Sequence, residues 1–248
     1  MYSAVSLVSI WGNFCIVAMA SSSQLPAPSL FNQTRVGFGL AGEYINGGAN
    51  LKVEPTGRLP PAIASSQSHL GKGLQIAPCV ELGATIASNY YLGLNINWRF
   101  SCIENKSKTP ATFLYYFLNE FKINQYTSIL LKTGYKFSPH TMIYGLVGPT
   151  VAKWSHTTDL FDANSVSLNR LRIDRKSLGI GIGLGFEYLF KEKYALSFDY
   201  THHFHKAVSQ AQNMTMRNIV GPRSGDLIIR VRPSYGVLAV RFTVFFNL

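Results

Sequence analysis

Bulky apolar residues alternate with glycine or polar residues along 177–204, on both sides of a short charged turn at 191–193. Leu, Ile, Phe or Tyr occupies every even position of 178–188, whereas the odd positions of 179–185 are all glycine. Successive side chains of a strand point to opposite faces, so each run has one large apolar face and one small or polar face. In a helix these residues would be scattered round the circumference, and the glycines would cost about 3–4 kcal/mol. The stretch therefore predicts a β-hairpin.

The same alternation recurs in six other parts of the chain, which we predict to be strands. These segments are 35–45, 74–87, 92–101, 113–137, 142–147 and 228–246. Tight turns are expected near Asn89, Pro139 and Glu192, and the remaining connections are long loops: 46–73, 103–112, 153–176 and 205–226. Together with the hairpin these segments make eight strands. Their order predicts an all-β fold, an antiparallel up-and-down barrel.

The composition of the two faces indicates where the barrel lies. A solvent face built from Gly179, Gly181, Gly183 and Gly185 would leave the backbone bare and would carry few charges. Small and polar residues suit the narrow interior of a closed barrel, with Ile, Leu, Phe and Tyr facing lipid. We therefore predict a transmembrane barrel with short periplasmic turns, long extracellular loops and, at eight strands, no large open pore. A soluble lipocalin-like ligand-binding barrel, with the faces reversed, is an alternative.

Residues 1–20 are apolar and contain no charged side chain, and they end in the small-x-small pattern Ala18-Met19-Ala20. This pattern predicts a signal peptide cleaved after Ala20, although it lacks the usual basic residue before the apolar run. An uncleaved membrane anchor is the alternative. We expect 21–33 to be a periplasmic lead-in and 34–248 to be the barrel domain. An exported chain of alternating strands, without a later apolar run of transmembrane length, points to the bacterial outer membrane.

The net charge is +11, from 23 Lys and Arg against 12 Asp and Glu, and the pI is near 9.6. The basic residues are dispersed and match no nucleic-acid-binding motif, so nucleic acid is not an expected partner. Outer-membrane lipid and lipopolysaccharide, whose headgroups are anionic, are the expected partners for this charge.

Several charged residues share the parity that should face the barrel interior. They are Arg35, Glu43, Glu81, Arg99, Lys132, Lys136, Glu187, Asp199 and Arg241. Their mixed signs favour a structural network of buried ion pairs that fills the lumen, over a gated ion path or a catalytic pair of carboxylates. If three residues form the turn near Asn89, Glu81 should lie opposite Arg99.

Neither the cysteines nor the histidines match a known site. The parity places Cys79 and Cys102 on opposite faces, which predicts two free thiols rather than a disulfide. His202, His203 and His205 suggest either a metal site or the His of a lipid A hydrolase, but His202 and His203 point to opposite faces and no Ser lies two residues beyond either. We predict interfacial or loop histidines, with no metal, no cofactor and no catalytic residue.

Four features together resemble a known family. They are the exported N-terminus, the hairpin from Lys132-Thr133-Gly134-Tyr135 to Tyr144-Gly145-Leu146, the alternation over 179–186, and the final strand with Phe242, Val244 and Phe246. They resemble the eight-stranded outer-membrane barrels of the OmpA transmembrane-domain, OmpX and opacity-protein group, from Thr34 to the end. The resemblance implies that the barrel-assembly machinery recognises the last strand through a C-terminal aromatic residue. Here the last residue is Leu248, so Phe246 would have that role.

These observations predict a non-enzymatic outer-membrane protein with a structural or surface-interaction role. An adhesin-like function, with the loops binding a host or surface ligand, is compatible with the prediction. The alternative within the membrane is a lipid-A-modifying hydrolase, which requires an outward-facing His–Ser pair near the rim of the barrel.

Overall fold

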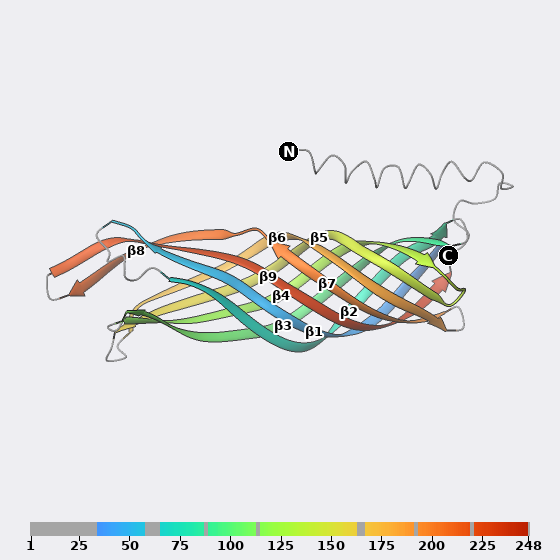
Figure 1. Ribbon diagram of the computed structural model, residues 1–248, viewed down its shortest axis with the longest axis horizontal. Helices are drawn as coiled ribbons and strands as arrows, with labels where there is room; N and C mark the ends of the chain where they lie inside the picture. Colours follow the sequence, from blue (N-terminus) through green and yellow to red (C-terminus); the bar gives the residue numbers. More distant parts are fainter. Residues whose placement is uncertain are drawn as a thin grey trace, which may run out of the picture.

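A computed structural model describes residues 34–57, 65–86, 89–112, 115–162, 167–190, 193–218 and 221–247 of the chain. The predicted signal peptide, its cleavage at Ala20 and the lead-in lie outside these residues. Over the described part the chain forms long antiparallel strands (Figure 1). They are β1 (Thr34–Pro55), β2 (Ser65–Ile86), β3 (Tyr90–Thr112), β4 (Tyr115–Lys136), β5 (Thr141–Asp162), β6 (Ser167–Phe190), β7 (Tyr194–His205), β8 (Val208–Asn218) and β9 (Gly221–Asn247). No helix within these ranges is long and apolar enough to cross a membrane.

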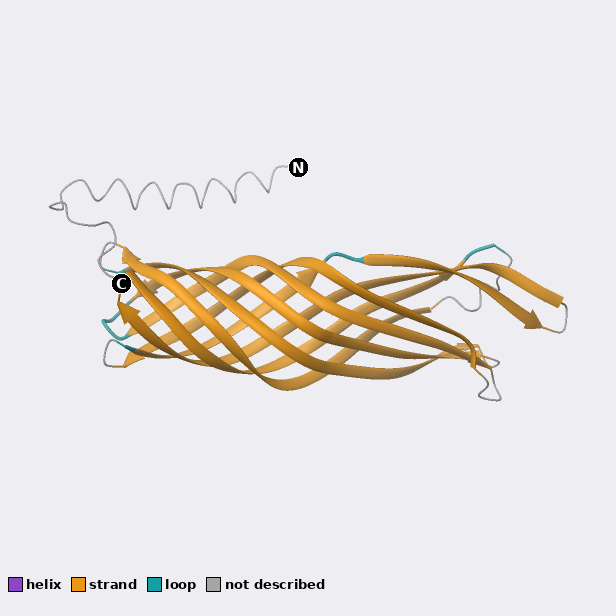
Figure 2. Ribbon diagram, turned by 180° about the vertical axis from the view of Figure 1, so that it is seen from behind, coloured by secondary structure: helices purple, strands orange, loops and turns teal. Residues whose placement is uncertain are grey.

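Eight of the strands close into a ring in the order β1-β2-β3-β4-β5-β6-β7-β9, with β9 paired to β1. Paired residues followed once round the ring lead from Arg35 to Ile45, a stagger of ten residues that tilts the strands. β8 pairs only with β9, and this hairpin projects beyond the ring at the end far from the C-terminus (Figures 1 and 2). The predicted eight-stranded barrel is confirmed.

The strands are much longer than the sequence pattern indicated. Most of the connections predicted as loops, 46–73, 103–112, 153–176 and 205–226, continue the strands beyond the predicted segments. The connections at the opposite end are short, as expected: β4 and β5, for example, are joined by 137–140. The molecule is thus an elongated barrel, and its strands form an extension on the side where irregular loops were expected (Figure 2).

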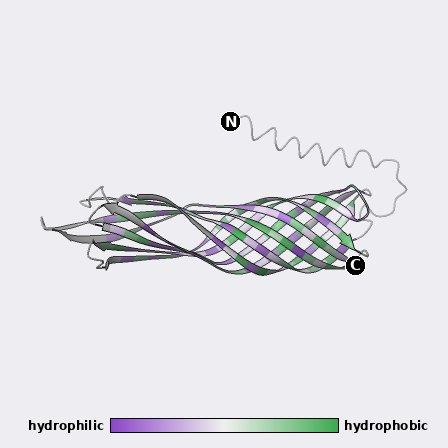
Figure 3. Ribbon diagram, turned by 60° about the horizontal axis from the view of Figure 1, so that its bottom comes forward, coloured by the Kyte–Doolittle hydropathy of each residue, from purple (hydrophilic) through white to green (hydrophobic). Residues whose placement is uncertain are grey.

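The polarity of the two faces reverses along the barrel axis, which explains why the extension was predicted as loops. Near the short turns the outer face is apolar, and Ile182 and Leu184 are 52% and 75% exposed. Farther along the same face of β6 come Lys176, Asp174 and Arg172, all exposed. We call the first region the apolar band and the second the extension. Hydrophobic and hydrophilic residues alternate along the strands of both regions (Figure 3).

A β-bulge lies where the polarity changes on β4. The register with β5 shifts between Ile123 and Gln125. Before the shift the odd-numbered Phe121 and Ile123 point inward, and after it the even-numbered Tyr126 and Leu130 do. An extra residue in one strand exchanges its two faces, so the bulge keeps large side chains inside on both sides of the boundary.

Inward-facing glycines make room for aromatic side chains in the lumen. A Cβ atom at Gly83 would lie 2.1 Å from the Tyr91 hydroxyl, and one at Gly185 would lie 2.4 Å from the Tyr144 ring. Cys79 also points inward and is a free, buried thiol. The side chain of Cys102 lies outside the described part of the structure.

Candidate functional site

The apolar band surrounds a lumen filled with charged side chains. Lys132 on β4 is fully buried, and its Nζ donates to Glu81 Oε1 at 2.8 Å and to Glu187 Oε2 at 2.5 Å. The Tyr91 hydroxyl donates to Glu81 at 2.7 Å, and the Ser197 hydroxyl donates to Glu187 at 3.0 Å. A single cation thus joins carboxylates from β2 and β6 across the interior.

Two further ion pairs lie in the same lumen. Arg99 pairs with Glu43, and Gln75 donates a second hydrogen bond to that carboxylate at 2.8 Å. Arg241 Nη2 lies 3.3 Å from Asp199 Oδ2. All of these charged groups are buried.

The predicted pairing of Glu81 with Arg99 is wrong. Glu81 lies opposite Asn95, because the turn between β2 and β3 is centred two residues earlier than the sequence suggested. Glu81 instead meets Lys132 from β4, which is not a neighbouring strand in the sheet.

Arg35 and Lys136 lie nearer the short turns. The Arg35 guanidinium stacks on the Phe245 ring, with its carbon 4.7 Å from the ring centroid. Lys136 Nζ donates to the Thr85 hydroxyl at 2.6 Å. With these two, all nine charged residues predicted for the lumen are placed: seven in ion pairs and two against other lumen side chains.

The interior of the extension is apolar, a feature that the sequence pattern did not predict. Its core contains Trp154, Phe117 and Phe121, all 1% exposed or less. Trp154 Nε1 donates to the Ser177 hydroxyl at 3.0 Å, so the buried indole has a partner. Side chains therefore occupy the barrel interior at both levels, with ion pairs inside the apolar band and a hydrophobic core beyond it.

The three histidines lie on β7 and do not act as one group. The prediction of interfacial or loop histidines is wrong for His203 and His205, which are buried. His203 and His205 point inward, where the Tyr126 hydroxyl lies 2.7 Å from His203 Nε2 and the Tyr235 hydroxyl lies 3.2 Å from His205 Nε2. His202 points to the outer face. Among the described residues no three His, Cys, Asp or Glu side chains are grouped so that they could hold a metal ion.

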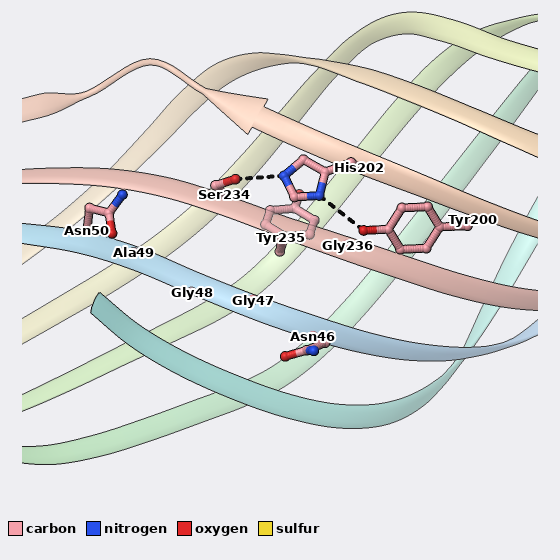
Figure 4. Close-up of a pocket in the computed structure, with 10 residues that line it drawn as sticks. All are labelled: Asn46, Gly47, Gly48, Ala49, Asn50, Tyr200, His202, Ser234, Tyr235 and Gly236. Atoms are coloured by element: carbon pink, nitrogen blue, oxygen red, sulfur yellow. Dashed lines mark hydrogen bonds between the residues drawn. The ribbon is translucent and has the colours of Figure 1, made fainter. Parts of the chain in front are cut away.

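His202 lies in a shallow groove of about 350 Å³ on the outer wall (Figure 4). The groove is lined by Asn46, Gly47, Gly48, Ala49, Asn50, Tyr200, His202, Ser234, Tyr235 and Gly236. His202 Nε2 lies 2.9 Å from the Ser234 hydroxyl and His202 Nδ1 lies 3.2 Å from the Tyr200 hydroxyl (Figure 4).

A serine within hydrogen-bond reach of an imidazole is the first requirement of a nucleophilic site. In this groove the other imidazole nitrogen contacts a neutral tyrosine hydroxyl instead of the carboxylate that orients the base in a Ser-His-Asp triad. A neutral hydroxyl stabilises a developing imidazolium less than a carboxylate does. The groove thus has the serine and the histidine of a Ser-His-Asp triad but lacks the carboxylate.

The outer wall of the extension carries charges that neutralise one another. On β3 and β4, Glu104 lies 2.8 Å from Lys106 Nζ and 3.0 Å from Lys122 Nζ. These hydrogen bonds, the one from Lys106 first, lower the pKa of Glu104 to about 2. On β5 and β6, Arg170 pairs with Asp159 at 3.5 Å and Arg172 with Asp174 at 2.8 Å.

Comparison with solved structures finds outer-membrane proteins of low sequence identity. The attachment invasion locus protein Ail of Yersinia pestis is 11% identical, covering 79% of this chain and 98% of its own, with a TM-score of 0.30. OprG of Pseudomonas aeruginosa is 13% identical, covering 88% and 98%, with a TM-score of 0.44. The outer membrane protease OmpT of Escherichia coli is 10% identical, covering 92% and 100%, with a TM-score of 0.38.

No curated protein matches the chain. The family model of the outer membrane protein beta-barrel domain matches residues 14–220, most of the chain. The match agrees with the closed ring of eight antiparallel strands and with the apolar outer band. The chain therefore belongs to the outer membrane protein beta-barrel domain family, and its place is the bacterial outer membrane.

Proposed function

We propose that the protein acts through its outer surface, as a non-enzymatic barrel whose extension binds ligands at the cell surface. The observation that carries this proposal is the filled interior. Lys132, Glu81 and Glu187 cross the lumen within the apolar band, and the core around Trp154 fills the extension. A solute has no wide path through such a barrel, so the exposed outer wall and strand tips are the parts left to meet partners.

Permeability and adhesion together test this proposal. We expect the purified barrel to give no steady ion conductance in a planar bilayer, because seven of its nine lumen charges are in ion pairs and the interior of the extension is apolar. Bacteria that display it are expected to adhere better to a layer of epithelial cells than bacteria with an empty vector. An open-channel conductance, or expression without any gain in adhesion, would contradict the proposal.

A second candidate function is cleavage of an acyl ester in lipid A, favoured by the His202–Ser234 contact at the outer wall. In that reaction Ser234 Oγ would attack the ester carbonyl while His202 accepts the hydroxyl proton. The bond to the lipid A alcohol would break as that oxygen takes the proton from His202, and water would then release the fatty acid from Ser234 by the same route. The soluble lipocalin-like alternative is excluded by the outer-membrane family and by the apolar outer face.

Mass spectrometry of lipid A separates the two functions. Lipid A would be compared from cells that express the wild type, Ser234→Ala, or no barrel, with Ser209→Ala as a control at an exposed serine of β8. The non-enzymatic function predicts the same acylation pattern in all four. An acyl chain lost with the wild type and the control, but retained with Ser234→Ala, would establish the hydrolase instead.

The barrel-assembly machinery is one more proposed partner of the protein. Phe246 near the end of β9 faces outward and is 56% exposed, beside Phe38 of β1 at a ring-centroid distance of 6.2 Å. This exposure supports a role for Phe246 as the aromatic residue that the barrel-assembly machinery recognises.

A further inference from the structure

Charged residues on the outer wall of the extension lie in rows at increasing distance from the apolar band. The row next to the apolar band, here called the lowest row, differs from the upper rows. On β3 to β6, opposite charges of the upper rows face each other across neighbouring strands: Glu104 is the register partner of Lys122, and Asp159 is the partner of Arg170. Cross-strand pairs of opposite charge stabilise a sheet, whereas like charges directly opposite destabilise it. The upper wall between β3 and β6 follows this rule. On β1 and β9, Lys52 faces Arg230, but Lys52 Nζ lies 2.5 Å from Glu54 Oε1.

In the lowest row the rule is broken. Lys153 on β5 is the register partner of Lys176 on β6, and both side chains are exposed. Lys206 lies beside them, because its backbone amide donates to the carbonyl oxygen of Leu178 at 3.1 Å. Arg232 on β9 also faces outward and is exposed. Among the described residues none of these four cations has a carboxylate within ion-pair distance.

The nearest acid on the same face is already engaged. Asp174 lies two residues from Lys176 on β6, but its carboxylate accepts from Arg172 Nε at 2.8 Å. The protein therefore leaves the facing Lys153 and Lys176 without a carboxylate partner, whereas Lys52 of the facing pair Lys52 and Arg230 has Glu54. Repulsion between facing lysines is a cost that an anion from outside the chain would remove.

The position of the row indicates which anion this is. Val151 and Leu178, the outward residues on the apolar side of Lys153 and Lys176, belong to the apolar band and are 38% and 68% exposed. Phe204, the outward residue on the apolar side of Lys206, is 45% exposed. Lys153, Lys176 and Lys206 thus lie at the first polar level outside the hydrocarbon, on the side of the strand extension, and Arg232 lies on the same outer face as the register partner of Asn50. Phosphate groups of outer-leaflet lipid lie at this level.

We propose that Lys153, Lys176, Lys206 and Arg232 form a binding site for the phosphate groups of lipopolysaccharide, which we call the cationic row. The lysines bind phosphate as point charges, and Arg232 adds a planar guanidinium that can bind two phosphate oxygens. The site is separate from the ligand-binding role proposed for the extension, and either could fail alone.

Binding of lipid A to the full-length barrel in detergent micelles tests this site. The change is Lys153→Gln with Lys176→Gln, and the matched control is Arg170→Gln with Arg172→Gln, which removes two cations from the compensated rows. Each basic residue near an anionic surface contributes about fivefold in affinity, so the first variant is expected to bind bisphosphorylated lipid A about 25-fold more weakly. The control is expected to stay within about twofold, because its cations are already paired.

A second measurement separates binding from a structural role. Without lipid A, Lys153→Gln with Lys176→Gln is expected to unfold at a slightly higher temperature than the wild type, because the facing charges no longer repel. With lipid A the wild type gains stability and the variant does not. Equal binding by variant and wild type, or an equal loss in the control, would overturn the site. Binding of inorganic pyrophosphate as tight as that of lipid A would overturn the assignment to lipid.

Discussion

Replacement of Lys132 by Met is expected to destabilise the barrel by about 3–5 kcal/mol, because it leaves two buried carboxylates without their cation. Glu81 and Glu187 both depend on the Lys132 ammonium, and all three side chains are buried in the lumen. Water does not surround these carboxylates, so an unpaired charge there is far more costly than at the surface. Unfolding by guanidinium in detergent micelles, followed by tryptophan fluorescence, measures the loss.

Two further variants show whether the cost comes from the unpaired charges. Lys122→Met removes a partly exposed cation from the wall of the extension and is expected to cost less than about 1 kcal/mol. Adding Glu81→Gln and Glu187→Gln to Lys132→Met is expected to recover most of the lost stability, because no carboxylate remains unpaired. If Lys132→Met were as stable as Lys122→Met, the lumen ion pairs would not hold the barrel as described.

Replacement of Trp154 by Ala is expected to loosen the extension while the part within the membrane stays folded. Trp154 is fully buried against Phe121, at a ring-centroid distance of 6.0 Å, and deletion of a large buried aromatic side chain costs about 3–5 kcal/mol. The lumen ion pairs lie outside this core, so they remain. Trypsin added to intact cells is expected to cut the variant at the Lys and Arg residues of the extension and to leave the wild type whole.

Leu118→Ala is the matched control, because Leu118 lies on the same extension but faces outward and is 36% exposed. The control is expected to resist trypsin like the wild type. Equal resistance of Trp154→Ala and Leu118→Ala would mean that the apolar core does not stabilise the extension.

The barrel itself was predictable because lipid imposes a simple pattern on a strand. In the hairpin 177–204, glycine faces the lumen and bulky residues face outward, and the structure has the same arrangement. The large outward residues and the charged inward residues of the predicted strands followed the same rule. This pattern identifies only the part of each strand that crosses the hydrocarbon layer.

The extension was missed because it follows the opposite rule. In 153–176 the inward residues include Trp154, Leu160 and Leu171, while the outward residues include Arg170 and Arg172. This is the alternation of a water-exposed sheet with an apolar core, and a search for outward apolar residues passes over it. An alternation of reversed phase next to a predicted membrane strand was the signal that could have found it.

Contacts between strands distant in sequence could not be predicted from local pattern. Glu81 meets Lys132 across the lumen, and only the stagger of the closed ring brings the two together. Likewise His202 meets Ser234 because the chain leaves the ring at β8 and β9 then returns to pair with β7. The facing pair Lys153 and Lys176 depends on the register of β5 with β6, and both residues lie in a segment predicted as a loop.

Nitroxide labels on the outer face of β6 test most directly where the bilayer ends. The labels are attached one at a time at positions 182 and 172, in a variant without other cysteines, reconstituted in lipid vesicles. We expect oxygen, which concentrates in hydrocarbon, to relax the label at 182, and a water-soluble nickel chelate to relax the label at 172. A label at 182 relaxed by nickel, or one at 172 relaxed mainly by oxygen, would contradict the reversal of polarity between the apolar band and the extension.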